Sequence, residues 1–115
     1  MTTNYSVGHE AEQRAAAYLQ GIGFKLVELN WKTRVCEVDI IAQKDQTIYF
    51  VEVKFRKNQQ QGSGLEYITP KKLQQMGFAA EVWVQENKWD GSYELAAVEL
   101  TGEGYLVTNF LERIE

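Results

Sequence analysis

The chain has 115 residues, of which 44% are hydrophobic and 24% charged, and its formal net charge is −4. This length and composition predict one globular domain over residues 1–115 and exclude an intrinsically disordered chain. The single cysteine, Cys36, and the single histidine, His9, exclude an internal disulfide, a multi-cysteine zinc site and a histidine-rich metal cage. The short apolar runs and the absence of a signal-peptide pattern at the N-terminus predict a cytoplasmic protein with no membrane partner.

The first predicted elements are a helix followed by three strands. The helix is expected to begin near Ser6, a residue type that favours the N-cap position, and to end at Gly21 and Gly23. Three segments rich in Val, Ile, Tyr and Phe follow, with the alternation that is typical of strands. The last two of them are separated by only three residues, which predicts an antiparallel hairpin. The strands are predicted over residues 24–31, 37–43 and 47–55.

A polar, glycine-bearing loop at residues 57–64 separates this hairpin from a second predicted helix. Thr69 supplies its N-cap and Pro70 its first helical position. Apolar residues then recur at helical spacing, at Leu73, Met76, Ala80, Trp83 and Val84. Two further strands are predicted at 93–100 and 105–110. The order αβββαββ predicts an α/β domain with a mixed sheet flanked by helices.

Charge is distributed unevenly along the chain. Residues 25–72 carry nine Lys or Arg and six acidic residues, whereas residues 73–115 carry two and eight. An anionic partner such as nucleic acid is therefore expected to contact the middle of the chain. The alternative is that these charges form ordinary solvated faces.

The predicted hairpin brings charged side chains together at its open end. With a turn centred on residues 45–46, Asp39 is expected to lie directly opposite Glu52. The same register puts Glu37 opposite Lys54. Strand alternation places these four side chains on one face. The reverse face is expected to be a continuous core surface formed by Val38, Ile40, Ala42, Tyr49, Val51 and Val53.

Directly opposed carboxylates repel each other and destabilise a sheet by about 0.5 kcal/mol. A bound cation would remove this repulsion, and Mg²⁺ or Mn²⁺ prefers the oxygens of one or two carboxylates, waters and substrate phosphates. Lys54, on the same face, could then orient the attacking water or stabilise developing charge on a phosphate. The alternative is a surface salt-bridge patch in which Lys54 neutralises Glu37 and Glu52.

Three segments resemble the YraN family of uncharacterised bacterial proteins. They are residues 30–41 (NWKTRVCEVDII), 48–56 (IYFVEVKFR) and 69–73 (TPKKL). Members of that family are predicted nucleases related to archaeal Holliday-junction resolvases. The resemblance implies a restriction-endonuclease-like α/β fold for this chain.

The resemblance also implies roles for individual residues. Asp39 and Glu52 match the metal ligands, and Lys54 matches the catalytic lysine. Glu10, early on the first helix, matches a position that reaches the same metal in the resolvase relatives. Glu37 matches the glutamate of the motif that precedes the aspartate, so it is expected to support the ligands or to add one.

Four basic residues are expected to contact the phosphate backbone of a nucleic acid. Arg56 and Lys72 match recurrent basic positions of the family. Lys57 and Lys71 are their neighbours in the chain and extend the same basic surface.

The function that these expectations describe is a Mg²⁺- or Mn²⁺-dependent endonuclease, in which Asp39, Glu52 and Glu10 hold the metal. Branched DNA is the substrate class of the relatives, and a junction cutter would need a homodimer to cut twice. The alternative is a non-catalytic module that keeps the same fold and binds nucleic acid or protein.

Overall fold

The computed structural model describes residues 4–58 and 68–114, which form two helices and five strands. In chain order the elements are α1 (Asn4–Gly21), β1 (Lys25–Lys32), β2 (Glu37–Lys44), β3 (Thr47–Arg56), α2 (Pro70–Glu86), β4 (Ser92–Thr101) and β5 (Leu106–Leu111). The predicted order αβββαββ is therefore confirmed. Within the predicted loop 57–64, residues 59–64 lie outside the described residues.

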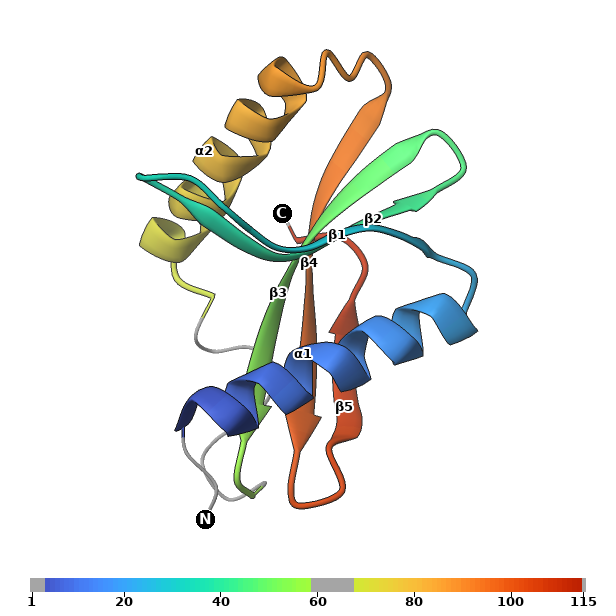
Figure 1. Ribbon diagram of the computed structural model, residues 1–115, viewed down its shortest axis with the longest axis vertical. Coiled ribbons are helices and arrows are strands. Elements are labelled where there is room, and N and C mark those ends of the chain that lie inside the picture. The colour runs from blue at the N-terminus through green and yellow to red at the C-terminus, as the bar shows by residue number, and fades with distance from the viewer. Residues whose placement is uncertain (1–3, 59–67, 115) are drawn as a thin grey trace.

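The strands form one mixed sheet in the order β1-β2-β3-β4-β5. Neighbouring strands are antiparallel except for β3 and β4, which are parallel over their whole length. A parallel pair needs a long crossover connection, and α2 lies in that connection (Figure 1). The mixed sheet with its two helices agrees with the predicted restriction-endonuclease-like fold.

The two helices begin in different ways. α2 begins as predicted: Pro70 occupies its first turn, and the Thr69 hydroxyl accepts a hydrogen bond from the backbone N–H of Lys72 at 3.1 Å. α1 begins at Asn4, before the predicted start at Ser6. Several residue types near this end favour an N-cap, so the sequence does not single out one start. Neither described helix is long and apolar enough to cross a membrane.

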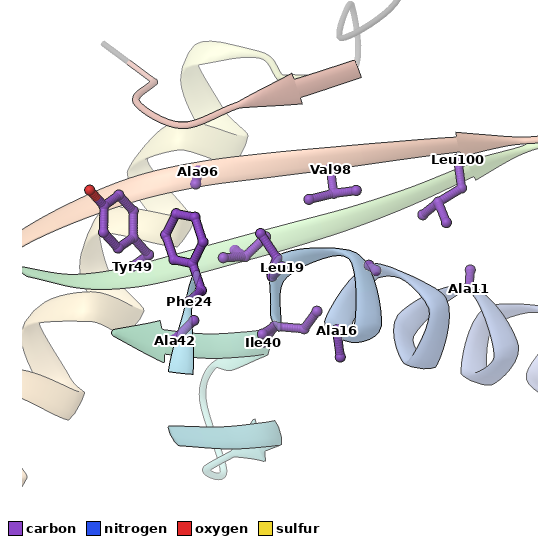
Figure 2. Packing of buried hydrophobic residues seen from close by; sticks show 12 residues of the cluster. Ala11, Ala16, Leu19, Phe24, Ile40, Ala42, Tyr49, Ala96, Val98 and Leu100 are labelled. Atoms are coloured by element: carbon purple, nitrogen blue, oxygen red, sulfur yellow. The ribbon is translucent and has the colours of Figure 1, made fainter. Parts of the chain in front are cut away.

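Each helix covers one hydrophobic cluster on the sheet. On the α1 side, small side chains let the helix approach Ile40 of β2 and Val98 of β4 closely, and Figure 2 shows this packing. On the α2 side, Trp83 packs edge-on to Phe50, with ring centroids 5.6 Å apart. The small residues of α1 in the first cluster are Ala11, Ala15 and Ala16.

The predicted core face of β2 is only partly correct. Ile40 and Ala42 belong to the α1-side cluster, as expected from their partners on β3. Val38 belongs instead to the α2-side cluster, together with Ile41. Strict alternation would put Val38 and Ile40 on the same face, so β2 must twist between them. This twist coincides with the point where β2 leaves β3.

Candidate functional site

The candidate site lies where β2 and β3 separate. Their antiparallel pairing runs from Lys44 and Thr47 to Ile40 and Val51, and the described pairing ends there. Beyond this point β3 continues beside β4 as far as Arg56, whereas β2 continues beside β1. The sheet therefore forks, and in Figure 1 the β1–β2 ribbon extends away from β3.

Asp39 lies at this fork. The predicted hairpin register is confirmed, but the strands separate before Asp39 and Glu52 can pair across the ladder. Instead, the Asp39 carboxylate accepts a hydrogen bond from the backbone N–H of Val53, with an Oδ2···N distance of 2.8 Å. The backbone N–H of Val53 lies beyond the end of the β2–β3 pairing, so the carboxylate takes the place of a β2 carbonyl as its acceptor. The same bond fixes the carboxylate between the two strands.

The charge state of Asp39 is strongly perturbed. Its pKa is raised from 3.8 to about 7, first because burial disfavours the charged form and next because Glu52 is close. Glu12 raises it further through its charge and a side-chain hydrogen bond, whereas the hydrogen bond from Val53 opposes the change. Three carboxyl groups thus share a region in which a cation would be favoured.

The carboxylate that α1 contributes to this cluster is Glu12. The structure does not bring the predicted residue, Glu10, to Asp39: its side chain pairs with Arg14 at 2.7 Å and is 41% exposed. The spacing of α1 carries a signal that could have identified Glu12. Glu12 precedes the buried residues Ala15 and Leu19 by three and seven positions, so it lies on the face that α1 turns toward the sheet.

A cleft of ≈ 490 Å³ opens beside Asp39 on the α1 side. Glu12, Glu37 and Asp39 line it together with Lys32, so acidic side chains outnumber basic ones there. His9 also contributes to its wall, and the His9 Nε2 lies 3.3 Å from the side-chain nitrogen of Gln13. Carboxylates that line a concave site are typical ligands of a hard divalent cation.

Glu52 is approached from the α2 side of the fork. The Lys72 Nζ lies 3.0 Å from its carboxylate, and the two side chains are 34% and 20% exposed. Lys72 was predicted to bind phosphate, but in this structure it neutralises a predicted metal ligand. The pair forms because the first turn of α2 lies over the fork, next to β3.

Lys54 and Glu37 do not face each other as predicted. Glu37 lies at the start of β2 and pairs with Lys32 of β1, because β2 has left β3 at that level. Lys54 follows Glu52 by two residues on β3 and is exposed. Because side chains alternate along a strand, Lys54 and Glu52 project from the same face of β3.

Arg56 does not form the exposed phosphate contact that was predicted. Its Nε donates to the Glu99 carboxylate of β4 at 2.7 Å, and these side chains are only 11% and 4% exposed. Thr108 and Asn109 donate to the other oxygen of Glu99, at 2.9 and 3.0 Å. The buried carboxylate is therefore satisfied by three side chains, which gives Arg56 a structural role.

The remaining predicted basic residues lie on the surface. Lys57 follows the end of β3 and is exposed. Lys71 is exposed in the first turn of α2 and lines a groove on that side of the fork. The tryptophans, by contrast, serve packing: Trp31 and Trp83 are buried, and the Trp89 indole donates to the backbone of Ser92 at 2.8 Å.

The donor set at the fork fits an open magnesium-type site. Among residues 4–58 and 68–114, no group of three or more His, Cys, Asp or Glu side chains is arranged so that it could hold a metal ion. Asp39 and Glu52 nevertheless supply two adjacent hard oxygen ligands, the number from which Mg²⁺ is commonly held when waters and substrate phosphates complete its shell. Burial is the first cause of the raised pKa of Asp39, and the negative charge of Glu52 and Glu12, which a bound cation would offset, adds to it.

Comparison with known proteins gives one family. The model of the uncharacterised protein family UPF0102 matches residues 11–107. A UPF0102 protein of Vibrio parahaemolyticus is 36% identical over 100 residues, which cover 84% of this chain and 83% of that protein. One from Syntrophus aciditrophicus is 36% identical over 107 residues, covering 90% and 84%. One from a Sulfurihydrogenibium species is 39% identical over 92 residues, covering 79% and 80%.

Proposed function

This chain belongs to the uncharacterised protein family UPF0102, and we propose that it is a divalent-metal-dependent nuclease that hydrolyses phosphodiester bonds. The observation that carries the proposal is the group of carboxylates at the fork of the sheet. Asp39 is held there by the backbone of Val53, and Glu52 and Glu12 add negative charge around it. Crowding of this kind destabilises the metal-free protein, and a bound cation would offset it.

Asp39 and Glu52 are the proposed ligands of Mg²⁺ or Mn²⁺, and Glu12 is the proposed contribution of α1. Asp39 is suited to this role because its carboxylate is anchored to backbone at 2.8 Å. Glu52 is suited because it projects from a central strand that is paired along its length with β4. When bound, the ion would polarise the substrate phosphate and lower the pKa of a water.

Lys54 and Lys72 supply positive charge beside these carboxylates. Lys54 leaves the same face of β3 as Glu52, and Lys72 lies within 3.0 Å of Glu52. Negative charge that develops on the phosphate oxygens during hydrolysis would be stabilised by such fixed cations. We assign Lys54 as the catalytic lysine. We further propose that Lys72 leaves its ion pair with Glu52 and pairs with the substrate phosphate instead.

The proposed substrate is DNA, in particular branched or structured DNA. This class follows from the resemblance to the junction resolvases, and shape rather than base sequence would then determine recognition. Symmetric cutting of a junction requires two active sites, so the same proposal includes a homodimer.

A second candidate is a non-catalytic binding module on the same fold. The ion pair between Lys72 and Glu52 favours it, because Glu52 is already neutralised without a metal. The two candidates differ in what a metal does. A nuclease requires the ion for turnover, whereas a module binds nucleic acid equally well in chelator.

The test is cleavage of labelled substrates in Mg²⁺ or Mn²⁺: a four-way junction, a linear duplex and a single strand. Asp39→Asn and Glu52→Gln should each lower the rate by at least about a hundredfold if these carboxylates hold the metal. The matched control is Asp45→Asn, since Asp45 is an exposed turn residue with φ 55, a conformation that Asn accepts well. Cleavage that survives Asp39→Asn, or that persists in chelator, would show the activity to be unrelated to this site.

A further inference from the structure

A groove on the α2 side of the fork is basic, whereas the chain as a whole is acidic. It has a volume of ≈ 720 Å³ and lies between the β1–β2 connection and the first half of α2. Four basic side chains and one acidic side chain line it, although the net charge of the chain is −4. They are Lys32, Arg34, Lys71, Lys72 and Glu37.

One stripe of α2 forms a wall of this groove. Its members recur at positions i, i+3, i+4 and i+7 and are Lys71, Gln74, Gln75 and Phe78. The other face of α2 packs on the sheet through Met76, Ala79, Ala80 and Trp83. The stripe is therefore not needed for the hydrophobic core.

Two apolar side chains are left in water along the groove. Phe78 is 53% exposed, and Val35 of the β1–β2 connection is 73% exposed. An exposed aromatic ring among basic groups is the combination with which proteins hold single-stranded nucleic acid, because bases stack on the ring while phosphates meet the cations.

Lys72 is paired with Glu52, but two other cations of the groove are placed to meet a ligand. Within the part of the chain that the structure describes, the ion pairs involve neither Arg34 nor Lys71. The groove also joins the candidate catalytic site. Glu37 and Lys32 line both this groove and the cleft beside Asp39, and Lys72 reaches from the groove to Glu52.

We infer that this groove binds an unpaired strand of nucleic acid, with a base stacked on Phe78 and phosphates bound by Arg34 and Lys71. The inference rests on the proposed nuclease function and narrows its substrate to nucleic acid that has an unpaired segment beside the scissile bond. A continuous duplex can offer phosphates to the cations, but its base faces are covered by neighbouring bases, so it has nothing to stack on Phe78.

Binding can be measured separately from cleavage. Fluorescence anisotropy in chelator would compare a labelled oligothymidylate with a hairpin duplex of equal length. Phe78→Ala should weaken binding of the single strand about 5- to 100-fold, whereas Phe78→Trp should restore it. Binding of the duplex should change less than about twofold. The control is Leu106→Ala, which removes a 65% exposed apolar side chain from β5.

The contacts between phosphates and the cations of the groove can be measured through the salt dependence of binding. Lys71→Gln should weaken binding of the single strand and reduce the slope of log affinity against log salt by about 0.7. Lys25→Gln, at the exposed start of β1, is the control and should leave the slope unchanged.

The outcomes distinguish this inference from the proposed function. If nucleic acid binds but Phe78→Ala behaves like Leu106→Ala, the stacking inference is wrong while the nuclease proposal stands. If the single strand and the duplex bind equally well in every variant, the groove is only a phosphate contact and the inference is again wrong. If neither nucleic acid binds even at low salt, the inference is wrong, and the proposed nuclease function is then decided by the cleavage test with the four-way junction in Mg²⁺ or Mn²⁺.

Discussion

Replacing Asp39 with Asn should stabilise the metal-free protein at neutral and alkaline pH. Asn keeps a side-chain oxygen that can accept the hydrogen bond from the Val53 backbone, now 2.8 Å from the Asp39 carboxylate. It removes the negative charge that is unfavourable beside Glu52 and Glu12. The substitution therefore tests electrostatic crowding at the fork with little change in shape.

The size of the effect follows from the pKa of Asp39, which is raised from 3.8 to about 7 in the folded protein. A difference of this size between the folded and unfolded pKa corresponds to at most about 4 kcal/mol in the free energy of unfolding. The Asp39 side chain is only half-buried, and its charge interacts with those of Glu52 and Glu12. We therefore expect the substitution to raise the free energy of unfolding by about 1–3 kcal/mol.

The pH dependence has a definite sign. Between about pH 4 and pH 7 the folded protein keeps a proton on Asp39 that the unfolded chain has lost, so the wild type loses stability as pH rises. Above about pH 7 the loss is complete and constant. Below about pH 4 the carboxyl is protonated in both states, and the variant should have no advantage from this source.

Urea unfolding of the wild type and Asp39→Asn, in chelator and across this pH range, measures the difference directly. Each kcal/mol should also raise the melting temperature by about 4 °C for a domain of this size. Asp45→Asn is the control, because Asp45 lies in an exposed turn. A variant that is no more stable than the wild type at about pH 8, or whose advantage does not change with pH, would refute the electrostatic reasoning.

Four further predictions concern the scaffold and can be checked by chemical unfolding. Glu99→Gln should cost about 3 kcal/mol, because it leaves the Arg56 guanidinium with a neutral partner in a buried setting; a cost under about 1 kcal/mol would contradict this. Thr69→Ala should cost about 1 kcal/mol through loss of the α2 N-cap. Gly91→Ala should be strongly destabilising, because its Cβ would lie 2.7 Å from the backbone oxygen of Gln46. Gly77→Ala, with no atom within 4 Å of the added Cβ, should instead stabilise α2 by about 0.5–1 kcal/mol.

Local patterns in the sequence were sufficient to predict the order of the elements and the register of the hairpin. Strand alternation with a short turn at residues 45–46 fixes the pairing of Ile40 with Val51, and the Thr-Pro pair fixes the start of α2. These signals involve neighbours in the chain. The alternation also directed Asp39 and Glu52 toward the same region, which the structure retains through the fork.

The errors concern contacts that depend on tertiary structure. The end of the β2–β3 ladder follows from the twist of a whole ribbon, so the sequence could not reveal that Asp39 would bond to the Val53 backbone. Arg56 and Glu99 are 43 residues apart, and only the parallel pairing of β3 with β4 brings them together. The position of Glu12 beside Asp39 is a different case, because the helical spacing of the buried alanines of α1 already places Glu12, and not Glu10, on the face turned toward the sheet.

The central claim, that the carboxylates at the fork form a divalent metal site, is tested most directly by calorimetric titration of Mn²⁺ into the wild type and Asp39→Asn. The titration would be made with the protein alone and again with a non-cleavable four-way junction, since substrate phosphates help to complete such sites. We predict saturable binding by the wild type that Asp39→Asn abolishes and that Asp45→Asn leaves intact. Equal binding by the wild type and Asp39→Asn, or no binding by the wild type even with the junction present, would contradict the claim.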